Sequence, residues 1–141
     1  MSRALGVDLG SRRIGIAASD PSGVLASPVG VVERRDDQES EHREILAAAT
    51  DIGATTIVVG LPLSLDGSHG PAAVAVLEEV EALGALARTV GVEVDTYDER
   101  FSTVTAEQGL REAKLGRKKR RSRIDAAAAT VILQGWLEAH R

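Results

Sequence analysis

The stretch ALGVDLGSRRIGIAAS at residues 4–19 decides the fold, because it predicts two strands joined by a tight turn. Apolar and small residues fill 4–10 and 13–19, and the Gly-Ser-Arg sequence between them is typical of a short connection. A third strand is expected at 27–34. Three strands with such short connections indicate an antiparallel meander.

Helical and strand-like segments alternate after the third strand. Helices are predicted at 38–52, 72–90, 103–114 and 124–139, and strands at 55–61 and 92–97. The order β-β-β-α-β-α-β-α-α predicts an α/β fold with a mixed five-stranded sheet covered by helices. Loops are expected at 62–71 and, in a basic segment, at 116–123. The pattern shows no linker, so residues 1–141 are expected to form a single domain.

Composition excludes several kinds of site. The 141 residues are 43% hydrophobic and 27% charged, which are ordinary proportions for a globular domain. The absence of cysteine excludes disulfides, thiolate zinc sites and cysteine nucleophiles. We see no signal peptide and no apolar run near the roughly 18 residues that would span a membrane. A cytoplasmic location is therefore expected.

Charge is unevenly distributed along the chain. The net charge is -4, yet residues 117–123 carry six positive charges and no negative one. We expect this segment to hold a nucleic-acid backbone, with strong salt dependence, although a solvated charge run is the alternative. The residues concerned are Arg117, Lys118, Lys119, Arg120, Arg121 and Arg123.

Acidic residues lie in the first predicted strand and directly after a later one. The first position is energetically unfavourable for a carboxylate, and the second is a common place for an active site. Asp8 lies among apolar and small residues of the first strand, with Gly6 and Gly10 on its face. Asp98 and Glu99 follow the strand at 92–97, and the sites of α/β sheets lie at such carboxyl ends. Each has a structural alternative, because Asp8 could cap a turn and the other two could favour a helix start.

A third acidic residue, Asp125, opens the last predicted helix and shares a helical face with Ala129 and Ile132. The alternative is a capping partner for Ser122. Carboxylates from the first strand, a late strand end and this helix could meet at one edge of the sheet. Such hard oxygen ligands suit Mg²⁺ or Mn²⁺, and two such ions promote phosphodiester hydrolysis.

The order and spacing of several motifs resemble those of the YqgF/RuvX family over nearly the whole chain. The motifs are Gly6-Val-Asp-Leu-Gly10 with Arg13-Ile-Gly-Ile-Ala17, Val59-Gly-Leu-Pro-Leu63 with Asp66-Gly-Ser68 and Gly70-Pro71, Asp98-Glu-Arg-Phe-Ser-Thr103, and Asp125-Ala-Ala-Ala-Ala129 with Ile132-Leu-Gln134. The resemblance implies a ribonuclease H-like sheet with helices on both faces. It also implies a metal-dependent nuclease that processes the 5′ end of the small-subunit (16S) ribosomal RNA precursor, or a Holliday-junction resolvase.

The resemblance further implies that Asp8, Glu99 and Asp125 are the catalytic metal ligands. Strand alternation leaves a choice at the second position. It leads from Val94 to Asp98, whereas Glu99 follows the parity of Tyr97. We prefer Glu99 and keep Asp98 as the alternative.

Two other classes of function fit parts of the sequence. Asp8-Leu-Gly10 with Gly15 and Asp20 is similar to the phosphate-binding turn of actin-like ATPases and sugar kinases, which need two such domains. A non-catalytic RNA-binding or ribosome-associated factor would need only the basic segment. Ribosomal RNA precursor is the favoured partner, with branched DNA, the ribosome, and a monomer or homodimer as open alternatives, and no membrane is expected. His42 and His140 are expected on helix surfaces.

Overall fold

The computed structural model describes residues 3–63, 66–98 and 117–140, with side chains described up to 98 and from 126 onwards. The strands are β1 (Arg3–Leu9), β2 (Arg13–Ser19), β3 (Ala26–Glu33), β4 (Ala54–Leu61) and β5 (Glu93–Asp98). The helices are α1 (Gln38–Asp51), α2 (Pro71–Arg88) and α4 (Arg117–Ala139). The helix predicted at 103–114 lies outside the described residues.

The five strands form one mixed sheet in the order β3-β2-β1-β4-β5. β1, β2 and β3 pair antiparallel, which confirms the predicted meander. β4 pairs parallel with β1, and β5 pairs parallel with β4. The carboxyl ends of β1, β4 and β5 therefore meet at the same edge of the sheet, and β1 is the central strand.

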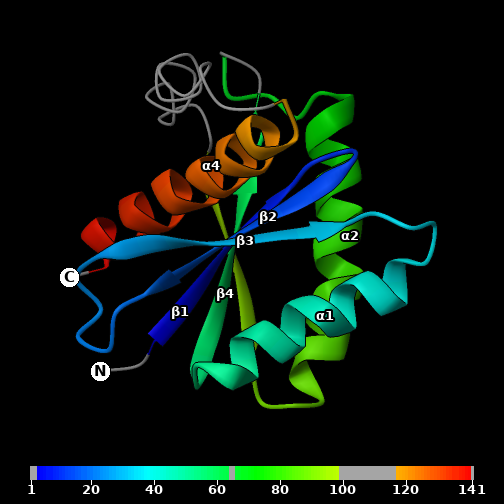
Figure 1. Cartoon of the computed structure of the whole chain (residues 1–141). Helices are drawn as coiled ribbons and strands as arrows, with labels where there is room; N and C mark the ends of the chain where they lie inside the picture. Colours follow the sequence, from blue (N-terminus) through cyan, green and yellow to red (C-terminus); the bar gives the residue numbers. More distant parts are fainter. Residues whose placement is uncertain (1–2, 64–65, 99–116, 141) are drawn as a thin grey trace.

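Helices cover both faces of this sheet, as the resemblance implied (Figure 1). α1 and α2 lie on one face, over a core that includes Leu5, Val7, Ile45, Ile57 and Leu83. Of the described helices, α4 is the one that covers the other face, over Ala4, Ala17 and Val58, with its own Ala129, Ile132 and Leu133. Burying each large aliphatic side chain contributes about 2 kcal/mol, so both layers hold the sheet.

The predicted basic loop at 116–123 is wrong, because residues 117–123 form the first turns of α4. Arg and Lys are good helix formers, and the segment contains neither glycine nor proline. The run of charge has no apolar periodicity, so its helical structure was not visible in the hydrophobic pattern. The basic segment at 117–123 and the segment at 129–137 that packs in the core thus belong to a single helix (Figure 1).

None of the helices in the described part of the chain is both long and apolar enough to cross a membrane.

Candidate active site

Asp8 lies near the carboxyl end of the central strand, on the face that α4 covers. A Cβ atom on Gly6 would lie 2.7 Å from Leu133 Cβ and 2.8 Å from the Ala129 carbonyl oxygen, so the Gly6 face of β1 meets α4. Strand alternation puts Asp8 on the same face, two residues nearer the strand end. Its side chain is half-buried. Asp8 therefore lies near the edge of the sheet at which the carboxyl ends of β1, β4 and β5 meet.

The neighbouring strands decide which face each later acid occupies. Val7 pairs with Val59, and Val59 pairs with Thr96, so these residues lie on the α1/α2 face with the core of that side. Asp98 is two residues beyond Thr96 and has the same parity. Asp8 and Asp98 thus lie on opposite faces of the sheet.

Tyr97 has the opposite parity from Asp98 and packs with the α4 core. A Cβ atom on Gly135 of α4 would lie 2.5 Å from its hydroxyl oxygen. The face that carries Asp8 is therefore the face of Tyr97, and Asp98 is not placed beside Asp8. Glu99 lies outside the described residues.

Asp125 belongs to α4, one helical turn before Ala129. The direction of the helix follows from Gln134, which accepts a hydrogen bond from the Ala26 amide (2.9 Å) and donates one to the Val24 carbonyl (3.0 Å). Ala26 pairs with Ser19 at the carboxyl end of β2, which lies beside the amino end of β1. α4 therefore runs from the carboxyl end of β1 towards its amino end. The backbone of Asp125 is consequently on the Asp8 side of Ala129.

The side chains of Glu99, Asp125 and the basic segment all fall outside the described side chains. Within the part that is described, no group of three His, Cys, Asp or Glu residues is arranged to hold a metal ion. Of the three predicted metal ligands Asp8, Glu99 and Asp125, Asp8 is thus the one whose side chain the structure describes. The β4–α2 loop also begins at this edge, where Ser68 N–H donates to Asp66 Oδ1 (2.9 Å).

A buried ionic cluster on the opposite face was not visible in the sequence. It comprises the buried residues Glu41 and His42 and the partly buried residues Arg34 and Glu79. Arg34 Nη1 lies 2.6 Å from Glu79 Oε2 and 3.0 Å from Glu41 Oε1, and Arg34 Nη2 lies 2.9 Å from Glu79 Oε1. The prediction that His42 is a surface residue is wrong. It is 2% exposed, and its Nε2 lies 2.8 Å from Glu79 Oε2. His140, by contrast, is exposed as expected.

Hydrogen bonds in this cluster outweigh the effect of burial on its charges. Burial alone would raise the pKa of Glu79, but hydrogen bonds from His42 and Arg34 lower that pKa to about 2. Burial likewise opposes ionisation of Glu41, yet hydrogen bonds from the Arg35 amide and Arg34 lower its pKa. Both carboxylates are therefore charged at neutral pH.

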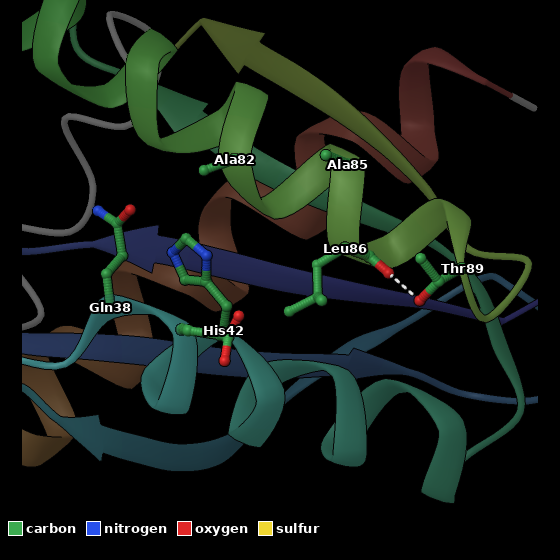
Figure 2. Close-up of a pocket in the computed structure, with 7 residues that line it drawn as sticks. Gln38, His42, Ala82, Ala85, Leu86 and Thr89 are labelled. Atoms are coloured by element: carbon green, nitrogen blue, oxygen red, sulfur yellow. Dashed lines mark hydrogen bonds between the residues drawn. The ribbon is translucent and has the colours of Figure 1, made fainter.

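A small cleft of about 340 Å³ lies beside this cluster, between α1 and α2 (Figure 2). Figure 2 shows His42 pointing from α1 towards α2, with Leu86 and Ala85 across the cleft. The sheet separates the cleft from Asp8, so the two belong to different faces. The cleft does not contribute to the site at the strand ends.

The sequence matches the family model described as RuvX, Holliday junction resolvase, over residues 2–139. The chain belongs to the RuvX family. A relative from Myxococcus xanthus is 43% identical over 139 residues, which cover 99% of this RuvX chain and 89% of the relative. One from Kineococcus radiotolerans is 48% identical over 138 residues, covering 97% and 72%. Both relatives carry the name "Putative pre-16S rRNA nuclease".

Among solved structures, this RuvX chain is similar to Thermus thermophilus RuvC in complex with a Holliday junction substrate. The TM-score is 0.62 at 18% identity, and the match covers 99% of this chain and 96% of RuvC. At this identity the likeness shows the fold alone. It confirms the expectation of a ribonuclease H-like fold.

Proposed function

We propose that this RuvX protein is a divalent-metal-dependent nuclease that cleaves the 5′ region of the 16S ribosomal RNA precursor. The observation that carries the proposal is the position of Asp8. It lies at the carboxyl end of the central strand, on the face where α4 brings the backbone of Asp125 towards the same edge. The names of its relatives support the substrate. The protein would act in the cytoplasm as one domain, residues 1–141.

The donor chemistry of this edge fits Mg²⁺ or Mn²⁺. Asp8 offers half-buried carboxylate oxygens near the carboxyl end of β1. The chain contains no cysteine to favour a softer metal. We propose that Asp8, Glu99 and Asp125 hold one or two such ions. When bound, the ions supply an activated water and stabilise the leaving oxygen.

Glu99 is proposed as the second acid in preference to Asp98. Asp98 has the parity of Thr96, on the face away from Asp8. Strand alternation continued by one residue would give Glu99 the parity of Tyr97.

We propose that the basic segment holds the substrate backbone next to this site. Positive charges at the amino end of a helix oppose the helix dipole, so they do not serve helix stability there. A polyanion would relieve this repulsion and release counterions. The residues proposed for this contact are Arg117, Lys118, Lys119, Arg120, Arg121 and Arg123.

A second candidate function is resolution of four-way DNA junctions. The description of the family model and the likeness to RuvC favour it. Paired cuts across a junction require two active sites related by symmetry, so this function would need a homodimer. RNA cleavage needs only a monomer.

The deciding experiment offers purified protein two labelled substrates in Mg²⁺ or Mn²⁺: RNA spanning the 5′ end of the 16S precursor, and a four-way DNA junction. Asp8→Asn is assayed beside it, with substrate binding measured separately. We expect cleavage of the RNA that disappears in Asp8→Asn while binding persists. Paired junction cuts would favour the second candidate. Binding of RNA without cleavage of either substrate would instead indicate a non-catalytic RNA-binding factor.

A further inference from the structure

Arg34 connects the buried ionic cluster to the turn that follows Asp8. Its Nε donates to the Gly10 carbonyl oxygen (3.1 Å), while its two Nη atoms hold Glu79 and Glu41. Its backbone amide donates to the Arg12 carbonyl oxygen (3.1 Å). One residue therefore binds two carbonyl groups of the β1–β2 turn, that of Gly10 through its side chain and that of Arg12 through its main chain.

The orientation of the guanidinium is fixed from the other side. Both Nη atoms bind the two oxygens of Glu79, and this paired contact sets the plane of the group. Glu79 is itself held by His42, and Glu41 by the Arg35 amide (2.7 Å). The position of Nε, and with it the Gly10 carbonyl, is thus determined by α1 and α2.

The β1–β2 turn transmits this restraint to Asp8. Gly10 N–H donates to the Asp8 carbonyl oxygen (3.0 Å), so the turn closes directly on the acidic residue. A Cβ atom on Gly10 would collide with the Arg13 carbonyl oxygen, so the turn as folded requires glycine at this position. Movement of the Gly10 carbonyl would therefore change the backbone that carries Asp8.

We propose that Arg34 is a positioning residue, which fixes the β1–β2 turn and thereby the carboxylate of Asp8 for metal binding and cleavage. The inference rests on the proposed nuclease function, since it concerns the geometry of Asp8. Arg34 lies on the α1/α2 side of the sheet and Asp8 faces α4, so Arg34 acts through the backbone and does not touch substrate. The buried charges that this arrangement requires are costly, and the hydrophobic core alone does not need them.

The test compares Arg34→Ala and Arg34→Lys with the matched control Arg35→Ala. Lysine keeps a positive charge beside the carboxylates but cannot bind them and Gly10 with one planar group. Arg35 is the adjacent residue, half-exposed, and its side chain pairs only with exposed Glu44 among the described contacts. Ile45→Val provides a core variant that costs about 1 kcal/mol of stability without touching the turn.

Two measurements are made on each variant, well below its unfolding temperature. The first is steady-state RNA cleavage, with kcat, KM and the Mg²⁺ concentration for half activity. The second is amide hydrogen exchange at Gly10–Arg13. We expect Arg34→Ala to lower kcat about tenfold and to raise the Mg²⁺ requirement, with KM for RNA unchanged. Exchange at the turn should accelerate. Arg34→Lys should be intermediate in both, and the two controls should resemble the wild type.

Several outcomes would overturn the inference. These are wild-type kcat in Arg34→Ala, unchanged exchange at the turn, or an equal loss of activity in Arg35→Ala or Ile45→Val. If Arg34→Ala does not fold, Arg34→Lys decides by the same criteria. If the wild type cleaves no substrate, the proposed function fails, and the role of Arg34 is judged on exchange alone. Faster exchange confined to Gly10–Arg13 would then support it, and unchanged exchange would reject it.

Discussion

Gly6 of β1 and Leu133 of α4 lie so close that a Cβ atom on Gly6 would be 2.7 Å from the Cβ of Leu133. The same atom would lie 2.8 Å from the Ala129 carbonyl oxygen, which belongs to the helix backbone and cannot rotate away. The absence of a side chain at Gly6 therefore allows the strand that carries Asp8 to pack closely against the helix that carries Asp125.

Gly6→Ala should lower the free energy of unfolding by about 2 kcal/mol, because α4 must move away from β1 to admit the methyl group. Urea denaturation followed by circular dichroism measures this difference. Gly84→Ala is the matched control. A Cβ atom there meets only Arg88 Nη1 at 3.7 Å, so alanine should raise stability by up to about 1 kcal/mol. Equal stability of Gly6→Ala and wild type would contradict the close packing of α4 on β1.

Glu99→Gln should abolish metal-dependent cleavage, whereas Asp98→Asn should keep most of it. The reason is the face of the sheet, since Asp98 has the parity opposite to that of Asp8. Cleavage rates at saturating Mg²⁺ and substrate affinities are measured for both variants. If Asp98→Asn is instead the inactive variant, the second acid is Asp98. Its side chain must then reach the face that carries Asp8, which regular strand alternation does not allow.

Replacing Lys118, Lys119, Arg120 and Arg121 by glutamine should weaken RNA binding and flatten its dependence on salt. If each residue contacts one phosphate, the slope of log affinity against log salt should fall in magnitude by about 3. Fluorescence anisotropy across a salt series gives this slope. Arg43 and Arg88 are exposed on α1 and α2 and serve as controls, because their removal should leave the slope unchanged. A quadruple variant with the wild-type slope would show that the basic segment is only solvated.

Glu79→Gln should destabilise the protein more at pH 7 than at pH 3. The pKa of Glu79 is about 2 in the folded state, against an ordinary value of 4.5. Its ionisation therefore stabilises the fold above about pH 4.5, and that contribution is lost as the pH falls from there towards 2. We expect a loss of about 3 kcal/mol at pH 7, because Arg34 loses a buried partner, and a smaller loss at pH 3.

Urea denaturation at the two pH values measures the loss in Glu79→Gln. Glu44→Gln is the control, since Glu44 is exposed and its pair with Arg35 contributes little. An equal loss in Glu79→Gln at both pH values would mean that the carboxylate titrates normally in the folded protein.

Local hydrophobic pattern was sufficient to predict most of the fold. The hairpin at 4–19, the strands at 55–61 and 92–97 and the helix at 72–90 all depend on apolar residues close in sequence, and each is present within two residues of its expected bounds. The start of α4 was missed because charge carries no information on burial. The strand alternation around Asp98 was seen, but the face that belongs to Asp8 follows only from the pairing of β1, β4 and β5.

The ionic cluster was beyond prediction for a different reason. Arg34, Glu41, His42 and Glu79 are residue types that usually lie at the surface, and nothing in their local sequence marks them as buried. Their burial depends on contacts across 45 residues of chain between Arg34 and Glu79. Pairing of this kind is a property of the assembled helices and sheet.

The continuity of α4 gives the molecule an internal length standard. Arg117 and Asp125 are joined by unbroken helix, in which each residue advances by about 1.5 Å, so their backbones are about 12 Å apart along the axis. A loop would let that spacing vary from one encounter to the next. If the basic residues bind phosphate, the bound nucleotide is kept at a constant distance from Asp125. The cleaved bond would then lie at a fixed number of nucleotides from the bound phosphate.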